Sequence, residues 1–342
     1  MRVWIPALRA NTGADTFMLN LAAGLERRGV SVSFKWFPRL GEICPAIMGQ
    51  APPPGTDIIH VSSDYGFPFT SRGVPVVATL FHWVHGADYA PYRGNLQRWY
   101  HRLLLRRYQE FSLRKATVVT TISEYSAQQL ASAWPGLHSH MIYPGIDTDF
   151  FHPSAARGVD GKFRLLFVGS PSRRKGFDLL PRLAALLGPE FELHYPEGPE
   201  YPSVGNLTRI GRLSRNSLRQ AYQDCDAFIL PTRLEGFGLV AAEAMACGKP
   251  VITSRCSSLP ELVRDGETGI LCPVDDVSAF VAAARKLRAD REVRERMGRA
   301  GRERVLRLFT LESMTEQYLS LYQTVLGQVG AITLAENGVT KK

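Results

Sequence analysis

The chain has 342 residues, more than one typical domain needs and enough for two domains of about 150 residues each. Hydrophobic residues make up 45% of it and charged residues 21%, which excludes a disordered or membrane-embedded composition. No stretch approaches the roughly 20 apolar residues that span a bilayer. The first residues, MRVWIPALRANTG, lack the pattern of a secretory signal. We therefore expect a cytoplasmic protein.

The formal net charge is +9 and the pI is near 9.4, an excess that suits nucleic acids, anionic lipids or phosphorylated substrates. The excess is concentrated in residues 98–115 and 285–307. The five cysteines contain no C-x-x-C pair, so we interpret them as small buried residues of a reduced protein. They are Cys44, Cys225, Cys247, Cys256 and Cys272.

The first half alternates short apolar, β-branched runs with helical stretches, which is typical of βαβ units and a parallel sheet. The predicted strands cover residues 2–6, 32–37, 57–61, 74–80 and 117–122. A helix is predicted over residues 14–28, where Phe17, Leu21 and Leu25 share one face and Gly29 follows as a stop.

The second half repeats this alternation, with strands predicted at 163–169, 191–195, 227–231 and 250–254 and helices at 177–187, 217–224 and 239–247. Residues 151–162 combine a proline, two glycines and mixed polarity, which indicates a linker. Beyond Asp276 the pattern is helical to about Leu326. We therefore predict an α/β protein with domains at 1–153 and 154–308, a helix at 309–328 and a frayed tail at 329–342.

Residues 227–254 carry the strongest chemical signal: a buried strand, a loop with Gly236 and Gly238, and then a helix. Ligands of open α/β sheets bind at the carboxyl ends of strands, and free N–H groups at a helix start attract negative charge. Glu235 and Glu243 bracket the loop. Glu243 lies among small apolar residues, where a carboxylate is rarely buried without a partner. A cis-diol such as a ribose would satisfy it, and pairing with a nearby Arg or Lys is the alternative.

Glu235 and Glu243 form an E-x7-E pattern that continues as Ala-Met-Ala-Cys-Gly-Lys-Pro-Val. This resembles the signature of the family 4 retaining glycosyltransferases, which have the GT-B fold. The resemblance implies two Rossmann-like doubly wound domains facing a central cleft, with acceptor binding in the N-terminal domain and nucleotide-sugar binding in the C-terminal one. Helix 309–328 would cross back to the N-terminal domain. Glu243 would hold the ribose and Glu235 the donor sugar. The backbone that would meet the sugar or the diphosphate belongs to Gly236, Phe237, Gly238 and Leu239.

The run LLFVGSPSRRKGFDLL, at 165–180, resembles another family element, a strand followed by a glycine and basic residues. By this resemblance Gly169 lies at the donor, and Lys175 with Arg174 neutralises the leaving diphosphate, as cations paired with phosphate do well. Many members carry Arg after this glycine, where this chain has Ser170, so Arg173 or Arg174 would substitute. A solvated basic loop is the other interpretation.

Further stretches match the family in order. Residues 257–273 resemble a segment whose start helps to bind the donor, and residues 141–151 resemble the interdomain stretch. In TTISEYSAQQL, at 120–130, Ser123 is expected to cap a helix. Residues 9–25 resemble the first loop, which approaches the donor phosphate and the acceptor, although Gly13 stands there without a second glycine. A G-x-G-x-x-G run is absent from the sequence, which argues against an NAD enzyme.

Two histidines follow the strand predicted at 74–80, His82 directly and His85 three residues later. Family members often have a histidine here that contacts the donor sugar near the reacting carbon. We assign this role to His82 because it is nearer the strand end, with His85 as the alternative and a structural histidine as the third interpretation. No third ligand accompanies the two in the sequence, so we reject a metal pair.

Two acidic pairs, Asp147 with Asp149 and Asp224 with Asp226, mimic the D-x-D metal motif of the other main glycosyltransferase fold. The first lies in the expected interdomain stretch and the second precedes a buried strand. We therefore predict no metal ligands and no cofactor.

The resemblance implies transfer of a sugar from a nucleotide-diphosphate sugar to a hydroxyl of a glycan, glycolipid or small molecule, with retention and without a metal. Same-face attack is expected, because the sequence offers no obvious nucleophile for double displacement. A nucleotide-sugar epimerase or phosphorylase on the same fold is one alternative. A nucleic-acid-binding protein is another, although no RNA-binding or helix-turn-helix signature is present.

Residues 96–116 hold six Arg or Lys against one acid, with aromatic and leucine side chains between them. A basic amphipathic helix of this kind can lie on an anionic membrane surface. The family resemblance implies lipid-linked acceptors among the candidates, and with this helix it leads us to expect peripheral contact with the inner face of a membrane. The alternative is a helix that packs its apolar face on the domain and leaves a solvated basic edge.

Overall fold

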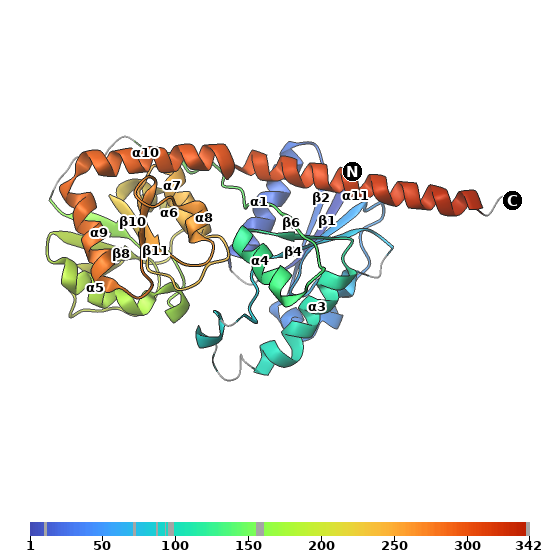
Figure 1. The fold of residues 1–342 in the computed structure, drawn as a ribbon, viewed down its shortest axis with the longest axis horizontal. Coiled ribbons are helices and arrows are strands. Elements are labelled where there is room, and N and C mark those ends of the chain that lie inside the picture. The colour runs from blue at the N-terminus through green and yellow to red at the C-terminus, as the bar shows by residue number, and fades with distance from the viewer. Residues whose placement is uncertain are drawn as a thin grey trace. The chain divides into compact units, whose positions relative to one another are not determined.

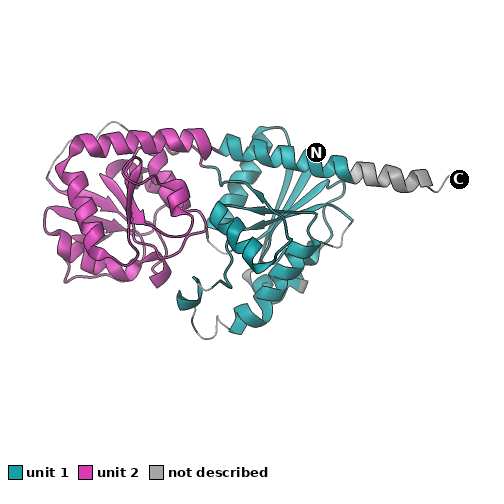
Figure 2. Cartoon of the chain, in the orientation of Figure 1, with its two compact units in different colours: residues 1–145, 311–342 teal, residues 146–310 magenta. Residues whose placement is uncertain are grey.

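The chain folds into two units, each built around one parallel β-sheet (Figure 2). Unit 1 comprises Met1–Gly145 and Leu311–Lys342, and unit 2 comprises Ile146–Thr310. The computed structural model describes residues 1–9, 12–70, 73–86, 88–92, 94, 99–154 and 161–339. For residues 39, 46 and 329–339 it describes the backbone alone.

The sheet of unit 1 has six parallel strands in the order β2-β1-β3-β4-β5-β6. They are β1 (Arg2–Leu8), β2 (Ser31–Phe37), β3 (Ile58–Ser62), β4 (Val76–Leu80), β5 (Val118–Thr121) and β6 (His140–Met141). Every residue of β3 and β4 is buried, as expected for central strands of a parallel sheet that is covered on both faces. The ring of Trp4 in β1 packs edge to face on Phe69 at 5.1 Å and anchors one side of the core.

The longer helices of unit 1 are α1 (Gly13–Arg27), α3 (Arg106–Lys115), α4 (Glu124–Ala133) and α11 (Leu311–Val339). A π-helical turn, η5 (His101–Leu105), leads into α3. Short 3-10 turns are η1 (Arg39–Glu42), η2 (Pro45–Met48), η3 (Phe67–Phe69) and η4 (Ala90–Tyr92). The Ser123 side chain accepts a hydrogen bond from the backbone N–H of Ser126, so Ser123 caps α4 as predicted.

Helix α11 packs in unit 1 beside α1 (Figure 1). The approach is close at Gly24, where a Cβ atom would lie 2.0 Å from Thr315 Oγ1. Tyr322 OH lies 2.6 Å from His60 Nδ1, and His60 Nε2 lies 2.9 Å from Thr79 Oγ1. Burial lowers the pKa of His60 to about 3, so this ring stays neutral and serves the network between α11 and the sheet.

The sheet of unit 2 has six parallel strands in the order β12-β11-β10-β7-β8-β9. They are β7 (Phe163–Leu166), β8 (Phe191–Tyr195), β9 (Leu207–Arg209), β10 (Ala227–Leu230), β11 (Val251–Ser254) and β12 (Gly269–Cys272). Its α-helices are α5 (Leu180–Leu187), α6 (Arg215–Asp224), α7 (Leu239–Ala246), α8 (Leu259–Leu262), α9 (Val277–Ala289) and α10 (Arg291–Leu308). Two 3-10 turns, η6 (Arg173–Lys175) and η7 (Phe177–Leu179), precede α5.

Arg302 of α10 holds the stretch of chain that enters unit 2. Its guanidinium donates to the carbonyl oxygens of Thr148 at 3.3 Å and Phe151 at 2.7 Å. It also donates to the carbonyl of Ala246, the last residue of α7, at 2.6 Å. The final carbonyls of a helix lack donors within the helix, so Arg302 satisfies one and ties it to the entering stretch. Of the predicted linker, residues 155–160 lie outside the described residues.

Three features differ from the predicted ones. Helix α11 continues to Val339, past the end predicted near Gly327, because alanine, leucine and glutamate follow without a proline. The sequence does not predict β6 and β9, whose two and three residues carry too little periodicity to be recognised, or β12, which begins with a glycine. Cys44 is exposed and Cys256 only partly buried, so the interpretation of all five cysteines as buried was wrong.

We expect Gly298→Ala to destabilise the protein. Gly298 lies in α10, where alanine favours a helix by about 1 kcal/mol. A Cβ atom there would lie 2.1 Å from the carbonyl oxygen of Gly248, so the backbone must shift, and we expect a net loss of about 1–3 kcal/mol.

Gly327 in α11 is the matched control, because a Cβ atom there meets nothing within 4 Å. Gly327→Ala should leave the free energy of unfolding unchanged or raise it by up to about 1 kcal/mol. Urea denaturation followed by circular dichroism measures both, and equal midpoints for the two variants would contradict the close packing at Gly298.

Candidate functional site

The strand order of unit 2 determines where a ligand-binding crevice forms. β8 and β9 lie on one side of β7, and β10, β11 and β12 lie on the other. In such sheets ligands bind outside the carboxyl ends of the strands, at the point where the order reverses. Two loops leave the sheet at this point, residues 167–176 after β7 and residues 231–238 after β10.

Hydrogen bonds join these two loops. The backbone N–H of Arg233 donates to the carbonyl of Arg174 at 2.8 Å, and Thr232 Oγ1 donates to the same oxygen at 3.0 Å. Arg174 Nη1 donates in turn to the carbonyl of Leu234 at 2.8 Å. The two loops therefore form one structure.

Two glycines let the loops come this close. Gly176 has φ +71° in the left-handed region, and a Cβ atom there would lie 1.9 Å from the carbonyl oxygen of Pro231. Only glycine can occupy this position without moving the β10 loop. A Cβ atom on Gly169 would lie 3.6 Å from Lys175 Cδ, so the predicted donor-site glycine adjoins the lysine stem.

Arg233 fastens the β10 loop to its surroundings. Its Nη1 and Nη2 donate to the two carboxylate oxygens of Asp178 at 2.7 and 2.9 Å, and its Nε donates to Asp275 Oδ1 at 2.6 Å. Bidentate pairs of this kind are strong and fix geometry. Arg233 therefore serves the structure of the loop.

Lys175 and Glu235 meet at the centre of the joined loops. Lys175 Nζ donates to Glu235 Oε1 at 2.6 Å, and the side chains are only 15% and 6% exposed. Burial alone would raise the pKa of Glu235, but the charges of Lys175 and Arg174 outweigh burial and hold this pKa below its ordinary value. Arg174 Nη1 lies 4.0 Å from Glu235 Oε2. The structure thus brings together three of the four predicted catalytic side chains.

Two serines hold the backbone of Glu235. Its N–H donates to Ser257 Oγ at 2.8 Å, and Ser258 Oγ donates to its carbonyl at 3.1 Å. Ser257 has φ 45°, a conformation that costs free energy for a residue with a side chain. The start of the predicted donor segment 257–273 therefore positions Glu235.

Glu243 lies in α7 and is only 7% exposed. The hydroxyl of Tyr222, fully buried in α6, donates to Glu243 Oε2 at 3.0 Å. Burial raises the pKa of Glu243 to about 7, and the Tyr222 hydrogen bond and the charge of Arg215 act in the opposite direction. Within the described residues no Arg or Lys forms an ion pair with Glu243, because Arg215 itself donates to Asp147 at 2.9 Å. The alternative of a direct ion pair is not found there.

Between Glu235 and Glu243, the groups available to a ligand are mainly backbone N–H groups. Gly238 has φ 99° and stands immediately before α7, whose first N–H groups have no partner within the helix. The ring of Phe237 is buried and packs on Phe309 at 5.3 Å, so only its backbone can face a ligand. Gly236 and Leu239 are partly exposed.

The predicted site residues of the N-terminal half lie in unit 1. Gly13 is the first residue of α1, which follows β1 where the strand order of unit 1 reverses. His82 follows β4 and its ring lies 5.3 Å from that of Tyr89. His85 packs edge to face on Trp83 at 4.7 Å. Both histidines are partly buried, and the choice between them stays a prediction.

The two D-x-D pairs have partners within the protein. Asp147 accepts from the Arg215 guanidinium, and Asp226 Oδ2 accepts from the backbone N–H of Arg164 at 2.8 Å. Asp224 Oδ1 accepts from the Gln220 amide at 2.9 Å. These contacts give Asp147, Asp224 and Asp226 structural roles.

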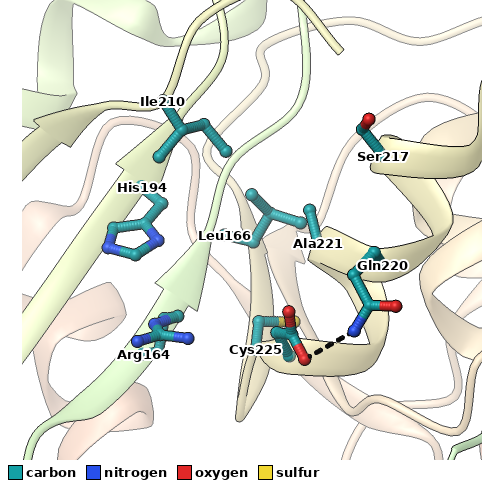
Figure 3. Close-up of a pocket in the computed structure, with 9 residues that line it drawn as sticks. Arg164, Leu166, His194, Ile210, Ser217, Gln220, Ala221 and Cys225 are labelled. Atoms are coloured by element: carbon teal, nitrogen blue, oxygen red, sulfur yellow. Dashed lines mark hydrogen bonds between the residues drawn. The ribbon is translucent and has the colours of Figure 1, made fainter. Parts of the chain in front are cut away.

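A cavity of about 310 Å³ lies elsewhere in unit 2, between β7, β8 and α6 (Figure 3). Arg164 and His194 line its sheet side, and Ser217 and Gln220 line its helix side. None of the predicted site residues lines this cavity. The joined loops therefore remain the candidate site.

Tyr222 cannot be recognised as a site residue from the sequence. Its partner Glu243 is 21 positions away and in another helix, and no motif marks the pair. A tyrosine on the apolar side of the helix before β10 was the only available signal, and such a residue is more often part of a core. Ser257 and Ser258 were noted only as part of a longer segment.

Two family models match the chain. "Glycosyltransferase Family 4" matches residues 34–150, and "Glycosyl transferases group 1" matches residues 203–304. Among curated proteins, an MMP alpha-(1->4)-mannosyltransferase from Mycolicibacterium hassiacum is 29% identical over 303 residues. That match covers 80% of this chain and 72% of the mannosyltransferase.

Solved structures share the fold. Sucrose-phosphate synthase from Thermosynechococcus elongatus matches with a TM-score of 0.81 and 21% identity, over 96% of this chain and 100% of that one. HepE from Anabaena, in complex with UDP and glucose, matches with a TM-score of 0.75 and 17% identity, over 95% of this chain and 100% of HepE. With the E-x7-E segment and the two parallel sheets, these matches confirm the predicted family and fold. The chain belongs to the family 4 glycosyltransferases and has their GT-B fold.

Proposed function

We propose that this glycosyltransferase moves a sugar from a nucleotide-diphosphate sugar to a hydroxyl acceptor, with retention of configuration and without a metal ion. The observation that carries this most is the Lys175–Glu235 pair, at 2.6 Å with Arg174 beside it, where the strand order of unit 2 reverses. The complex of the similar HepE with UDP and glucose supports a nucleotide sugar as donor.

Unit 2 would bind the donor and unit 1 the acceptor. Glu243 would hold the ribose, because a carboxylate only accepts hydrogen bonds and a cis-diol offers two donors. Tyr222 occupies Oε2 of Glu243 and leaves the other oxygen and further lone pairs for the diol. The binding form would be the carboxylate, whose population depends on the pKa near 7.

The leaving diphosphate would meet Lys175, Arg174 and the first amides of α7. Donors fixed in advance where negative charge develops stabilise a transition state without reorganisation. Before the donor binds, Glu235 holds Lys175 in place. In the complex the diphosphate would replace Glu235 as the partner of Lys175, and Glu235 would accept hydroxyls of the sugar. Gly169, Gly236 and Gly238 would let the ligand approach the backbone.

Transfer would occur by attack on the same face as departure. The bond from the anomeric carbon to the phosphate oxygen breaks, and the acceptor oxygen bonds to the same face of that carbon. The departing phosphate oxygen takes the proton of the acceptor hydroxyl. His82 would contact the donor sugar near this carbon, and Gly13 would bring backbone to the donor phosphate and the acceptor.

We further propose that the protein works in the cytoplasm and contacts an anionic membrane through residues 96–116, of which 99–116 are described. Five cations on exposed positions support this, Arg102, Arg106, Arg107, Arg114 and Lys115. Among the described residues, no helix has the length and apolar character needed to cross a bilayer. A lipid-linked acceptor is the substrate class that such contact would serve.

Thermal-shift measurements with UDP-, GDP-, ADP- and TDP-sugars test the donor. A ligand at 100 times its Kd should stabilise the protein by about 2.7 kcal/mol, which raises Tm. We expect Glu243→Ala to lose this shift, because the diol loses its acceptor. A sugar nucleotide that shifts the wild type and the variant equally would overturn the role of Glu243.

Tyr222→Phe should shift the pH at which donor affinity is half-maximal to a higher value. The Tyr222 hydroxyl stabilises the charged form of Glu243, so its removal raises a pKa that already lies at about 7. Hydrogen bonds to charged groups contribute about 1.5–3 kcal/mol, which corresponds to about 1–2 pH units. Donor affinity should therefore be weaker than wild type at pH 7 and recover at higher pH.

Isothermal titration of the donor between pH 6 and pH 9 measures this shift. Tyr322→Phe is the control, because it removes a buried hydroxyl in unit 1 that contacts His60. A Tyr222→Phe profile parallel to that of wild type, merely lower at every pH, would mean that Tyr222 only stabilises the fold.

Substitutions in the Lys175–Glu235 ion pair should affect the free energy of unfolding and the turnover rate differently. Lys175→Met leaves a buried carboxylate without its cation, which we expect to cost about 3–5 kcal/mol. The double variant Lys175→Met/Glu235→Gln removes both charges and should recover most of that stability. Turnover of the double variant should remain lower by a factor on the order of 10²–10³, because the diphosphate has lost a fixed cation. Recovery of turnover together with stability would show that the pair is structural.

A further inference from the structure

Exposed apolar side chains gather on two segments of unit 1. Among the described residues, six of eleven exposed large hydrophobic side chains lie there. They are Leu40, Ile43, Ile47, Trp99, Leu103 and Phe111, with exposed fractions between 42% and 63%. We call these six residues the platform. Soluble proteins rarely leave apolar groups clustered in water unless the cluster binds something.

The segment 39–48 turns its apolar residues outward. Leu40, Ile43 and Ile47 lie in or beside the 3-10 turns η1 and η2, and their exposed fractions of 60%, 62% and 42% place them on the solvent side of the segment. The opposite side faces the core, because Met48 is 1% exposed and a Cβ on Gly41 would lie 2.7 Å from its sulfur. Leu40, Ile43 and Ile47 therefore contribute little to the hydrophobic core of unit 1.

The second segment supplies a matching row. Trp99, Leu103 and Phe111 lie four and eight positions apart along the helical run 99–115, in which residues 99 and 100 lead into η5 and α3, and all three are exposed on it. Leu105 and Leu113 of the same run are buried in the core. This helix therefore covers the domain with one side and still presents apolar residues on the other.

Hydrogen bonds hold the two segments side by side. Tyr100 OH donates to the carbonyl of Glu42 at 2.7 Å, and Tyr108 OH donates to the carbonyl of Ile43 at 3.3 Å. The ring of Phe67 stacks on Tyr108 at 5.1 Å and lies 6.5 Å from Phe111. The outward row of 40–47 thus adjoins the helix.

Positive charge surrounds this apolar area. Arg102, Arg106, Arg107, Arg114 and Lys115 are exposed on the same helix. Glu110, its single acid, is paired with Arg114 at 3.0 Å. Apolar residues edged by cations match an anionic lipid surface, in which apolar groups enter the acyl boundary and cations meet headgroups.

We propose that segment 40–47 and helix 99–115 form one lipid-facing surface that rests on an anionic bilayer. This rests on the membrane contact proposed above and assigns it a second element that the basic helix does not contain. Leu40, Ile43 and Ile47 enter the headgroup boundary beside Trp99, Leu103 and Phe111. A nucleic acid would use the cations and leave the apolar row in water, so the observations favour lipid.

Co-sedimentation with phosphatidylcholine vesicles, with and without 30% phosphatidylglycerol, tests the surface. The wild type should bind the anionic vesicles and not the neutral ones. Leu40→Ser/Ile43→Ser should weaken the partition coefficient about tenfold or more, and Leu103→Ser/Phe111→Ser should do the same. Serine removes apolar area without adding charge. The matched control is Leu186→Ser/Leu306→Ser, two leucines of unit 2 that are 45% and 46% exposed, and it should bind as wild type does.

The outcomes separate the two proposals. If Arg106→Gln/Arg107→Gln and the helix serines weaken binding but Leu40→Ser/Ile43→Ser does not, the helix contacts the membrane alone and segment 40–47 has no part in it. If the wild type binds neither kind of vesicle, membrane contact itself is overturned. If light scattering shows a dimer that the platform variants dissolve, the surface is a protein interface and the lipid proposal fails. An unchanged thermal shift with the donor shows that each variant is folded and leaves the transferase proposal untouched.

Discussion

An ion pair removed from water, Lys175 with Glu235, sets what the two loops of unit 2 can do. Burying each charge costs several kcal/mol after relaxation, and attraction repays this only with good geometry and further hydrogen bonds. Here the pair closes at 2.6 Å with Arg174 nearby, and two serines hold the glutamate backbone. The arrangement depends on Gly176, since a side chain there would collide with the carbonyl of Pro231 and push the charges apart. The strand order of unit 2 determines where the two loops meet, and Gly176 lets them come close enough for Lys175 to contact Glu235.

The sequence predicted the parallel sheets because apolar β-branched runs alternate with helical ones, a pattern set by local burial. It also marked Lys175, Glu235 and Glu243, because the loop and helix around them form a contiguous motif. It could not identify Tyr222, whose contact exists only because α6 and α7 lie on the same sheet. It missed the role of 39–48 for a related reason: the apolar residues there follow short 3-10 turns, which match neither helix nor strand periodicity.

Helix α11 lies in unit 1, although unit 2 separates it from the rest of unit 1 in the sequence. It follows unit 2 in sequence, yet its tyrosines close the core of unit 1. Tyr318 and Tyr322 are fully buried and meet a row of polar side chains, His60, Thr79 and Thr120, inside the sheet. Without α11, His60 Nδ1 would lose its partner Tyr322, and buried polar groups are costly when unpaired. Unit 1 therefore takes part of its core from a helix that follows unit 2 in the sequence.

The two glutamates of the E-x7-E segment have the same side chain, but their surroundings shift their pKa values in opposite directions. Both carboxylates are almost fully buried, so composition alone would give them the same pKa. Two cations hold the pKa of Glu235 below its ordinary value. Burial raises that of Glu243 to about 7, against the smaller opposite effects of the Tyr222 hydroxyl and the charge of Arg215. When surroundings move the pKa values of two carboxyl groups apart, the groups can take different roles in a site. The two cations therefore favour the charged form of Glu235, which accepts the hydrogen bond from Lys175. Burial raises the pKa of Glu243 to about 7, so the proposed diol, by donating to the carboxylate, would also favour its charged form, and donor binding and ionisation of Glu243 would be coupled.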